Sequence, residues 1–283
     1  MIPATFDYVR AGSVDEAVDA LKQHGDEAKL LAGGHSLLPL MKLRFAAPEV
    51  LIDLGRVEQL RGVCDLGDGR LAIGSMTRHI DVMDDPLVRE HCGVLADVTA
   101  KVGDPQVRHR GTIGGALAHG DAASDLPAVL AALEGTLVAQ GPNGTREIAA
   151  SDFFVDYLTT SLEDDELVTE VRVPKIVGPW GWHYEKFTRV AQAWAIVGVL
   201  AMVKRSNGSI EEARVGLTNM ATVPVRASGV EQALAGHSPD AIADAAANAA
   251  DGTNPSSDLS ASAEYREHLA RVLTRRALEA AAR

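Results

Sequence analysis

The sequence predicts an α+β fold in which mixed strands and helices are followed by an antiparallel meander and a helical end. Residues 5–54 alternate short apolar runs of strand length with amphipathic stretches of helical period. Asn207-Gly208 separates two apolar runs, as in a two-residue hairpin turn. Residues 230–250 and 263–282 carry apolar positions at helical spacing, and the polar residues 251–262 between them are expected to form a loop. Together these patterns indicate sheets with helices packed on them.

Residues 5–54 are expected to form strand, helix, strand, helix and strand in that order. Ser13 is a candidate N-cap, and Glu16 three residues later completes the pattern of a capping box. Residues 29–32 form a short buried strand that runs directly into a glycine pair. Residues 37–43 are expected to form a short helix or extended segment, and residues 50–54 a last buried strand.

Residues 60–175 are expected to mix short strands with two helices. Gly67-Asp68-Gly69 marks a hairpin turn. A helix is expected over Leu87–Val102, ending at Gly103, and another over Asp125–Leu133 with Ser124 as its N-cap. The remaining strands are expected at Thr136–Gln140, Arg146–Ile148 and Leu167–Val173.

Pro174, Gly178 and Pro179 suggest a domain boundary near residue 178. We therefore divide the chain into residues 1–177, made of parts 1–57 and 58–177, and residues 178–283. The second domain is expected to hold a three-stranded antiparallel meander followed by helices. The strands are Trp180–Thr188, Ala195–Lys204 and Ile210–Leu217, and the helices are Val230–Leu234, Asp240–Ala250 and Ala263–Ala282.

The composition excludes several classes of protein. The net charge of −12 argues against a nucleic-acid-binding surface, which is normally basic. No apolar run approaches the roughly 20 residues of a membrane-spanning helix. The N-terminal residues show no basic region followed by an apolar stretch, so we expect no secretory signal and a cytoplasmic location.

No metal site and no catalytic side chain are predicted. Cys64 and Cys92 are too few for an iron–sulfur cluster, and we expect both to be buried as small hydrophobic residues rather than joined in a disulfide. The histidines lack a metal-ligand spacing, and His79 and His91 are interpreted as ordinary core or surface residues. A G-x-S-x-G nucleophile motif is absent, because Gly74-Ser75-Met76 lacks the second glycine.

Two glycine pairs have a common physical explanation. Gly33-Gly34 lies in Ala32–Ser36, and Gly114-Gly115 lies in Gly111–Ala116. Adjacent glycines let a backbone turn tightly and approach an anion, and free N–H groups then bind phosphate oxygens. Neither loop matches the dinucleotide or P-loop fingerprints. From the residues alone, each remains either a phosphate site or a plain tight turn.

The residues around both pairs resemble the FAD-diphosphate loops of the flavoprotein subunits of molybdenum hydroxylases. Residues 29–39, KLLAGGHSLLP, are similar to the first loop. Residues 112–115, TIGG, followed by 121–128, DAASDLPA, are similar to the second. The opening MIP, the segment FDY at residues 6–8 and GLTN at residues 216–219 are most similar to the medium subunits of aerobic carbon monoxide dehydrogenases. The resemblance covers essentially the whole chain.

This resemblance implies a fold and a cofactor. The fold is a two-part FAD-binding domain of the vanillyl-alcohol-oxidase (PCMH) type with a C-terminal α+β domain. The implied FAD contacts are Leu31, Ala32, Gly33, Gly34, His35, Ser36, Leu37, Thr112, Ile113, Gly114, Gly115, Ala116, Asp125, Lys186 and Trp194.

Some of these positions have implied roles with plainer alternatives. Asp125 corresponds to the carboxylate that holds the adenosine ribose, although it could equally be a first-turn acid that interacts with the helix dipole. Lys186 corresponds to a lysine near the flavin; the alternative is an ordinary solvated lysine on a strand. Trp194 stands where relatives often have tyrosine, and it could stack on the flavin or simply belong to the core. Ala116 replaces a common asparagine, so only a backbone contact could survive there.

The resemblance also implies an electron-transfer subunit with partners. They are a small subunit with two [2Fe–2S] clusters and a large subunit with the molybdopterin cofactor, in a dimer of heterotrimers. Electrons would pass through the clusters to FAD and then to a quinone-like acceptor, in a cytoplasmic complex or one attached to the inner face of the membrane. Carbon monoxide is the substrate that the resemblance favours, and aldehydes and N-heterocycles are the alternative substrates. A self-sufficient flavin oxidase or reductase, or a non-redox nucleotide-binding assembly module, is the alternative. Residues 104–110 are hypothesised to face the iron–sulfur subunit.

Overall fold

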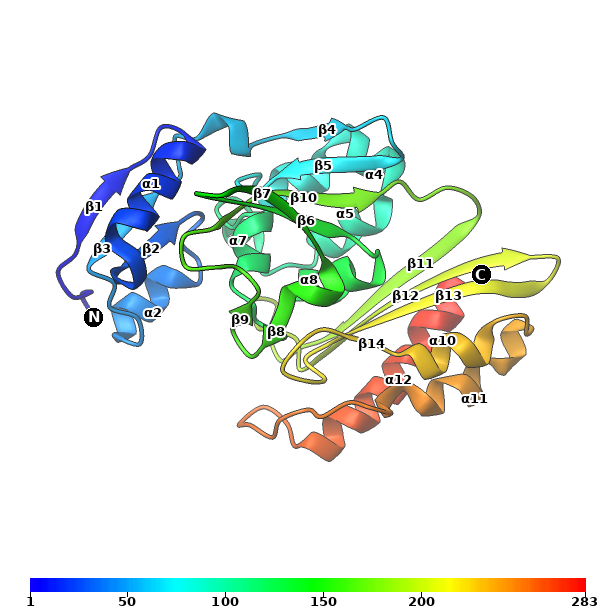
Figure 1. Cartoon of the computed structure of the whole chain (residues 1–283). Helices are drawn as coiled ribbons and strands as arrows, with labels where there is room; N and C mark the ends of the chain where they lie inside the picture. Colours follow the sequence, from blue (N-terminus) through cyan, green and yellow to red (C-terminus); the bar gives the residue numbers. More distant parts are fainter.

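The computed structural model describes all 283 residues as three packed regions that follow one another along the chain (Figure 1). The first is a parallel sheet with strand order β1-β3-β2 and two helices. Its α1 begins at Ser13, whose hydroxyl accepts a hydrogen bond from the backbone N–H of Glu16 at 3.1 Å. The Glu16 carboxylate reaches the N–H of Gly12, one residue beyond the N-cap. The elements are β1 Asp7–Arg10, α1 Val14–His24, β2 Ala28–Leu31, α2 Leu37–Leu43 and β3 Val50–Asp53, as expected.

The middle region is a five-stranded antiparallel sheet in the order β4-β5-β10-β6-β7. Its strands are β4 Val63–Asp65, β5 Arg70–Gly74, β6 Thr136–Gly141, β7 Gly144–Ala149 and β10 Leu167–Pro174, with a small pair β8 Phe154–Asp156 and β9 Thr159–Thr160. The helices are α3 His79–Asp84, α4 Pro86–His91, α5 Gly93–Thr99, α6 Pro105–Arg108, α7 Ile113–Ala118, α8 Asp125–Ala132 and α9 Ala150–Phe153.

Two expectations for this region were wrong, the unbroken helix and the burial of Cys64, and a third, the Ser124 cap, was met in position only. The single helix over Leu87–Val102 is broken into α4 and α5, because Cys92 adopts a non-helical backbone with φ −145° and ψ 52°. The buried Cys92 is free, as is Cys64, which is exposed rather than buried because it lies on the edge strand β4. The Ser124 hydroxyl also makes no hydrogen bond as the cap of α8.

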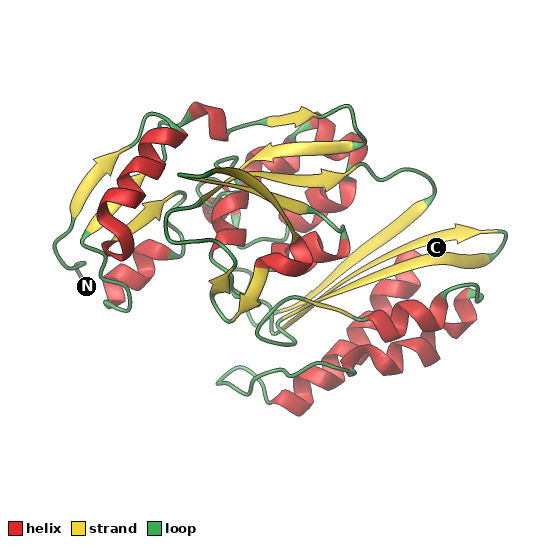
Figure 2. Cartoon of the chain, in the orientation of Figure 1, coloured by secondary structure: helices red, strands yellow, loops and turns green.

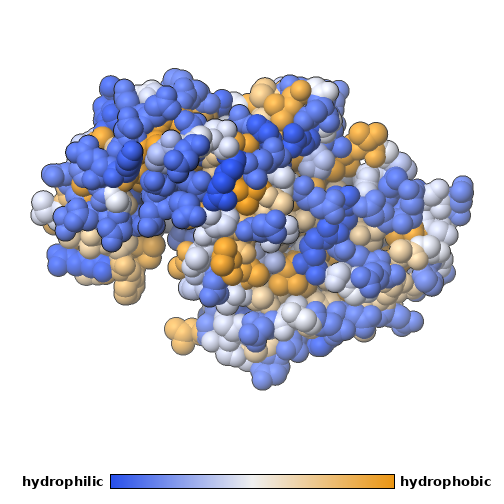
Figure 3. Space-filling view, in the orientation of Figure 1, coloured by the Kyte–Doolittle hydropathy of each residue, from blue (hydrophilic) through white to orange (hydrophobic).

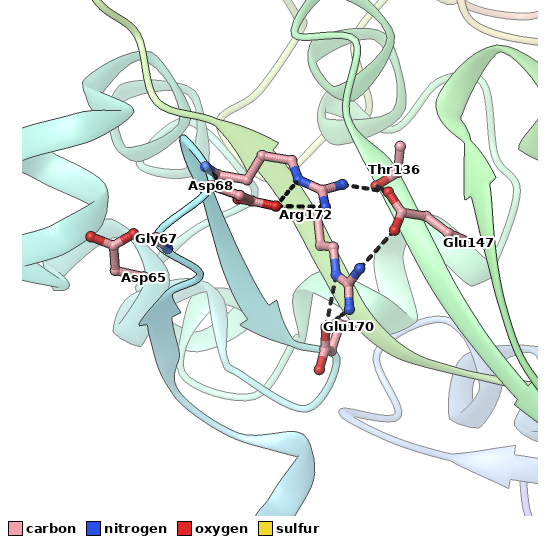
Figure 4. A network of polar contacts seen from close by, with 8 residues as sticks. Asp65, Gly67, Asp68, Thr136, Glu147, Glu170 and Arg172 are labelled. Atoms are coloured by element: carbon pink, nitrogen blue, oxygen red, sulfur yellow. Dashed lines mark hydrogen bonds and ion pairs between the residues drawn. The ribbon is translucent and has the colours of Figure 1, made fainter.

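A network of ion pairs crosses the middle sheet, as Figure 4 shows. The carboxylate of Glu147 on β7 accepts hydrogen bonds from Arg70 on β5 at 2.5 Å and from Arg172 on β10 at 2.6 Å. Arg70 also pairs with Asp68 in the β4–β5 turn, and Arg172 pairs with Glu170. Because these side chains are partly exposed, water screens each pair, and the network contributes modestly to stability.

The C-terminal region is a four-stranded antiparallel sheet covered by helices on one side (Figure 2). Its elements are β11 Trp180–Phe187, β12 Val197–Ser206, β13 Ser209–Thr218, β14 Val225–Arg226, α10 Ser228–Leu234, α11 Ile242–Ala246 and α12 Ala263–Ala281. The sheet therefore has four strands where three were expected. The additional strand, β14, is only two residues long and pairs with β13 after a loop. The expected helix over Asp240–Ala250 is a short α11 between two 3-10 turns, Pro239–Ala241 and Ala247–Ala250.

The β12 strand is buried on both faces. Val199, Ala201 and Val203 pack into the core under the C-terminal helices, whereas Leu200 and Met202 pack into the core of the middle region. Alternate residues of a strand point to opposite faces, so a strand between two cores is apolar throughout. This arrangement fixes the C-terminal sheet against the middle region and places the β11–β12 loop beside it.

Candidate functional site

A cavity of about 400 Å³ lies where the first region meets the middle region. Figure 3 shows an indentation in the molecular outline between the N-terminal lobe and the rest of the chain. Ligand cavities of small-molecule sites usually occupy ~300–1,000 Å³, so the space suits an organic ligand. Both glycine loops line it, and the loops of residues 162–168 and the exposed Trp194 complete its wall.

The first glycine loop presents free backbone donors. Gly33, Gly34, His35 and Ser36 lie between β2 and α2, and none of their N–H groups donates to an acceptor within the chain. Gly34 has φ +76°, a left-handed conformation that glycine adopts without strain. Consecutive N–H groups around such a residue form a concave donor surface that binds anions. This loop therefore has the donors that a phosphate group requires.

The second glycine loop uses its donors internally. The N–H groups of Ile113 and Gly114 donate to the carbonyls of Thr77 and Ser75, and that of Gly115 donates to the Thr112 hydroxyl at 3.2 Å. Thr112 is thereby the N-cap of α7. The expectation that both glycine pairs expose free donors is thus corrected: in the second loop only the Thr112 N–H lacks an acceptor in the chain.

The glycines of the two loops are required by close packing as well as by ligand access. A Cβ atom on Gly33 would overlap the backbone carbonyl of Arg110, at the start of the second loop. A Cβ on Gly114 would overlap the backbone and side chain of Ser75 at the end of β5. The two loops therefore touch each other and the sheet, and substitution at either glycine would push them apart.

The structure brings most of the predicted contacts together. Leu31, Ile113, Asp125 and Lys186 do not line the cavity, and Ile113 is instead buried in the middle core. The predicted residues that do line it are Ala32, Gly33, Gly34, His35, Ser36, Leu37, Thr112, Gly114, Gly115, Ala116 and Trp194.

Asp125 and Lys186 form a buried ion pair between the middle and C-terminal regions. The Lys186 ammonium on β11 lies 2.6 Å from the Asp125 carboxylate at the start of α8, and the Tyr184 hydroxyl donates to the same carboxylate at 2.6 Å. Burial raises the pKa of Asp125, while the ammonium and the tyrosine hydroxyl act in the opposite direction. Lys186 is thus neither solvated nor open to the cavity.

The loop that carries Trp194 is anchored at both ends to neighbouring segments. The Asn219 side-chain amide donates to the carbonyl of Ala195 at 2.8 Å, and the Gln192 amide donates to Asp104. Trp194 itself is 53% exposed, so it is a rim residue rather than a core residue. An exposed aromatic ring at the mouth of a cavity is available for stacking on a planar ligand.

Ser75 and His79 line the cavity, although the sequence predicted no role in a binding site for either residue. The Ser75 hydroxyl and the His79 Nδ1 atom are buried without any hydrogen-bond partner. Burial, aided by nearby His35 and Arg108, lowers the pKa of His79 to about 4, so its imidazole is neutral at pH 7. Only their position after a strand that ends beside the second loop could have indicated them.

The segment of residues 104–110 divides into an inward and an outward part. Asp104 caps α6 by accepting from the Val107 N–H at 2.9 Å. The Arg108 guanidinium points inward and donates to the Val102 carbonyl at 3.0 Å. Arg110 is exposed. Of the two arginines in this segment, only Arg110 is therefore presented to a partner.

No cluster of three or more histidine, cysteine, aspartate or glutamate side chains could hold a metal ion. The helices are all too short or too polar to cross a membrane.

Comparison with known proteins places the chain in a family. Residues 4–176 match the family described as the FAD binding domain in molybdopterin dehydrogenase. Residues 182–281 match the CO dehydrogenase flavoprotein C-terminal domain. The chain belongs to the FAD-binding medium subunits of the molybdopterin dehydrogenases.

Relatives of this medium subunit match it from end to end. The carbon monoxide dehydrogenase medium chain of Hydrogenophaga pseudoflava is 42% identical over 99% of this chain and 98% of its own. The glyceraldehyde dehydrogenase medium chain of Sulfolobus acidocaldarius is 36% identical, over 99% of each chain. A solved structure of carbon monoxide dehydrogenase from Hydrogenophaga pseudoflava superposes with a TM-score of 0.96 at 44% identity, over 99% of this chain and 98% of that one. The recognition made from the glycine loops is therefore confirmed.

Proposed function

We propose that the cavity holds FAD with its diphosphate on the first glycine loop. The observation that carries this proposal is the run of four free N–H groups from Gly33 to Ser36 at the cavity wall. A diphosphate supplies the negatively charged oxygens that such a run binds. The unpartnered Ser75 hydroxyl and His79 Nδ1 add polar groups to the same wall, so the residues present fit the cofactor.

The two ends of the cavity suit the two ends of FAD. We assign the flavin to the end with Trp194, Val102 and Val107, where an aromatic side chain and two valines offer stacking and apolar contact. The adenine is assigned to the end formed by Lys29 and residues 162–168. Asp125 and Lys186 remain proposed contacts of the ribose and the flavin, and reaching the cofactor would require their ion pair to separate.

Within a complex, this medium subunit would act as an electron relay. FAD supplies reversible electron transfer when bound, and the chain supplies binding, orientation and electrostatics. The two cysteines of the chain are fewer than the four thiolates of a usual iron–sulfur cluster, so the clusters would belong to a partner subunit. The proposed route is from a molybdopterin subunit through [2Fe–2S] clusters to FAD and then to a quinone-like acceptor.

We further propose a complex of the carbon monoxide dehydrogenase type. The support is the 42% identity to a carbon monoxide dehydrogenase medium chain. Medium chains of this family also occur in glyceraldehyde dehydrogenase, so the substrate would be selected on the molybdopterin subunit. Isolation of the complex and assay with carbon monoxide, aldehydes and N-heterocycles would decide the substrate.

The purified full-length chain tests cofactor binding directly. We expect a flavin absorption band at about 450 nm after reconstitution, and quenching of the Trp194 fluorescence when FAD binds. Trp194→Phe should keep the flavin absorption band. It should lose the quenching that arises from Trp194 and retain any that arises from Trp180 and Trp182, the two other tryptophans of the chain. A chain that stays colourless with added FAD would favour the non-redox module. Turnover of a substrate by the single chain would favour the self-sufficient flavoenzyme.

A further inference from the structure

The segment of residues 216–219, GLTN, lies at the end of β13 and lines no part of the cofactor cavity. Its first residue, Gly216, packs closely on α8 of the middle region. A Cβ atom at Gly216 would lie 2.6 Å from the backbone carbonyl oxygen of Ala128, so only glycine allows this approach. The C-terminal sheet is therefore held directly against the middle region near the strand end that Asn219 follows.

Asn219 connects two segments that contribute to the cavity wall. It has φ +63°, a left-handed conformation that asparagine adopts more readily than most residues. Its backbone N–H donates to the carbonyl of Ala122 at 2.8 Å, and its side-chain amide donates to the carbonyl of Ala195 at 2.8 Å. Ser124 and Trp194, which line the cavity, lie next to these two acceptors in the chain. One residue outside the cavity thus joins both segments.

A buried arginine holds the same end of the Trp194 loop. Arg266 on α12 is 1% exposed, and its guanidinium donates to the carbonyl of Ile196 and, at 2.7 Å, to the carboxylate of Asp258. The Ile196 carbonyl also accepts a longer hydrogen bond of 3.3 Å from the Asn219 amide. Hydrogen bonds from a charged donor are stronger than neutral ones. The β12 end of the loop is therefore fixed from the C-terminal core.

The rest of this loop, residues 188–196 between β11 and β12, has few contacts of its own. Residues 189–192 and Trp194 are exposed, and the hydrogen bond within the loop backbone runs from the Ala193 N–H to the Val190 carbonyl at 3.0 Å. Segments with few buried contacts open at a low cost in free energy. Because Trp194 immediately precedes the anchored carbonyls, the anchors restrain the position of its ring.

We propose that Asn219 is a positioning residue of the cofactor site: its side-chain amide, supported by Arg266, holds Trp194 at the flavin end of the cavity. This inference rests on the proposed function, which assigns the flavin to that end. Asn219 does not line the cavity, so it acts through Trp194 and not by contact with the cofactor. Aromatic stacking depends on the separation and offset of the rings, and a ring that is already restrained loses less freedom on binding.

The test replaces Asn219 by glycine in the full-length chain. Asn219→Gly removes the side-chain amide and keeps a residue that adopts a positive φ without strain. Asn207→Gly is the matched control, because the exposed Asn207 has φ +50° in the β12–β13 turn and does not line the cavity. Amide hydrogen exchange is measured in the FAD-free chain. The dissociation constant for FAD and the fluorescence of the bound flavin are then measured with FAD added.

We expect the Ala193 and Ile196 amides to exchange at least about tenfold faster in FAD-free Asn219→Gly, and at the wild-type rate in the control. The dissociation constant for FAD should rise about threefold to tenfold, which corresponds to the loss of one hydrogen bond. The bound flavin should also fluoresce more strongly, because a displaced indole ring no longer stacks on it. A merely structural role would lower the unfolding free energy and leave the fluorescence of the bound flavin unchanged.

A double-mutant cycle with Trp194→Ala identifies the route of the effect. If Asn219 acts through Trp194, Asn219→Gly should change the dissociation constant for FAD less than about twofold once Trp194 is replaced. Asn219→Asp is the second variant, in case the glycine variant does not fold. It keeps the size of the side chain, but a carboxylate cannot donate to the Ala195 carbonyl, so its effects should have the same direction.

Two results would overturn the inference and leave the proposed function intact. One is equal loop exchange and equal flavin fluorescence in Asn219→Gly and Asn207→Gly. The other is full additivity of Asn219→Gly and Trp194→Ala in the double-mutant cycle. A wild-type chain that did not bind FAD would instead overturn the proposed function, and the exchange rates of the FAD-free chain would still show whether Asn219 anchors the loop.

Discussion

At the scale of single residues, the neutral imidazole of His79 couples stability to pH. His79 is 3% exposed, and its pKa falls from 6.5 to about 4. Above pH 6.5 the residue is neutral in both the folded and the unfolded chain. Between pH 6.5 and 4 the unfolded chain takes up a proton that the folded chain excludes, so the free energy of unfolding falls as the pH falls.

The change expected from His79 is up to about 3 kcal/mol across that range. His79→Leu should remove it, so the difference in unfolding free energy between the variant and the wild type should depend on pH only between 4 and 6.5. Urea unfolding at a series of pH values measures this difference. A pH-independent difference would show that the pKa of His79 is the same in the folded and the unfolded chain.

At the scale of elements, the two glycine loops have different roles in the candidate site. The loop between β2 and α2 has free N–H donors. The N–H groups of the loop that starts α7 donate instead to Ser75, Thr77 and Thr112, so this loop is held in place by hydrogen bonds within the chain. Gly33 joins the two, because its Cα lies against the Arg110 carbonyl. Cofactor binding therefore depends on a contact between loops that lie far apart in the sequence.

Gly33→Ala should raise the dissociation constant for FAD at least about tenfold, since the added methyl group forces the loops apart and a loss of ~1.4 kcal/mol of binding free energy already has this effect. Gly229→Ala is the control, because a Cβ there meets nothing within 4 Å. The ratio of flavin to protein absorbance measures occupancy. The unfolding temperature of the flavin-free variants separates lost binding from lost folding. Equal flavin content in the two variants would contradict the loop contact.

At the scale of the whole molecule, the Asp125–Lys186 pair ties the C-terminal region to the cofactor-binding part. Both side chains are less than a tenth exposed. Asp125→Asn would leave the Lys186 ammonium buried without a counter-charge, and we expect a loss of about 3–5 kcal/mol of stability. Asp65→Asn, which breaks the more exposed pair between Asp65 and Lys175, should lower the stability far less, because water screens that pair.

Chemical unfolding of these two variants tests the role of the buried pair. A second variant, Asp125→Asn with Lys186→Met, removes both charges and should recover part of the lost stability. If Asp125→Asn were as stable as Asp65→Asn, the Asp125–Lys186 ion pair would not stabilise the fold, and the two side chains could separate to contact the cofactor.

Much of the fold followed from local signals. The Ser13 cap and the Asn207-Gly208 turn involve only neighbouring residues, so the sequence specifies them; the turn residues have the positive φ values of 50° and 82° that such a turn requires. The strand β14 and the break at Cys92 could not be predicted in this way. A two-residue strand is defined by its partner β13, and the end of a buried helix by the space that its neighbours leave.

The candidate site shows the same division. The sequence by itself determined the two glycine loops and the family resemblance, because tight turns and their glycines are recorded in short runs of residues. Only the tertiary structure decided that the first loop keeps free donors, that Ser75 and His79 join the wall, and that Asn219 anchors the Trp194 loop. Each of these properties depends on contacts between segments far apart in the chain, and such contacts form only when the regions pack together.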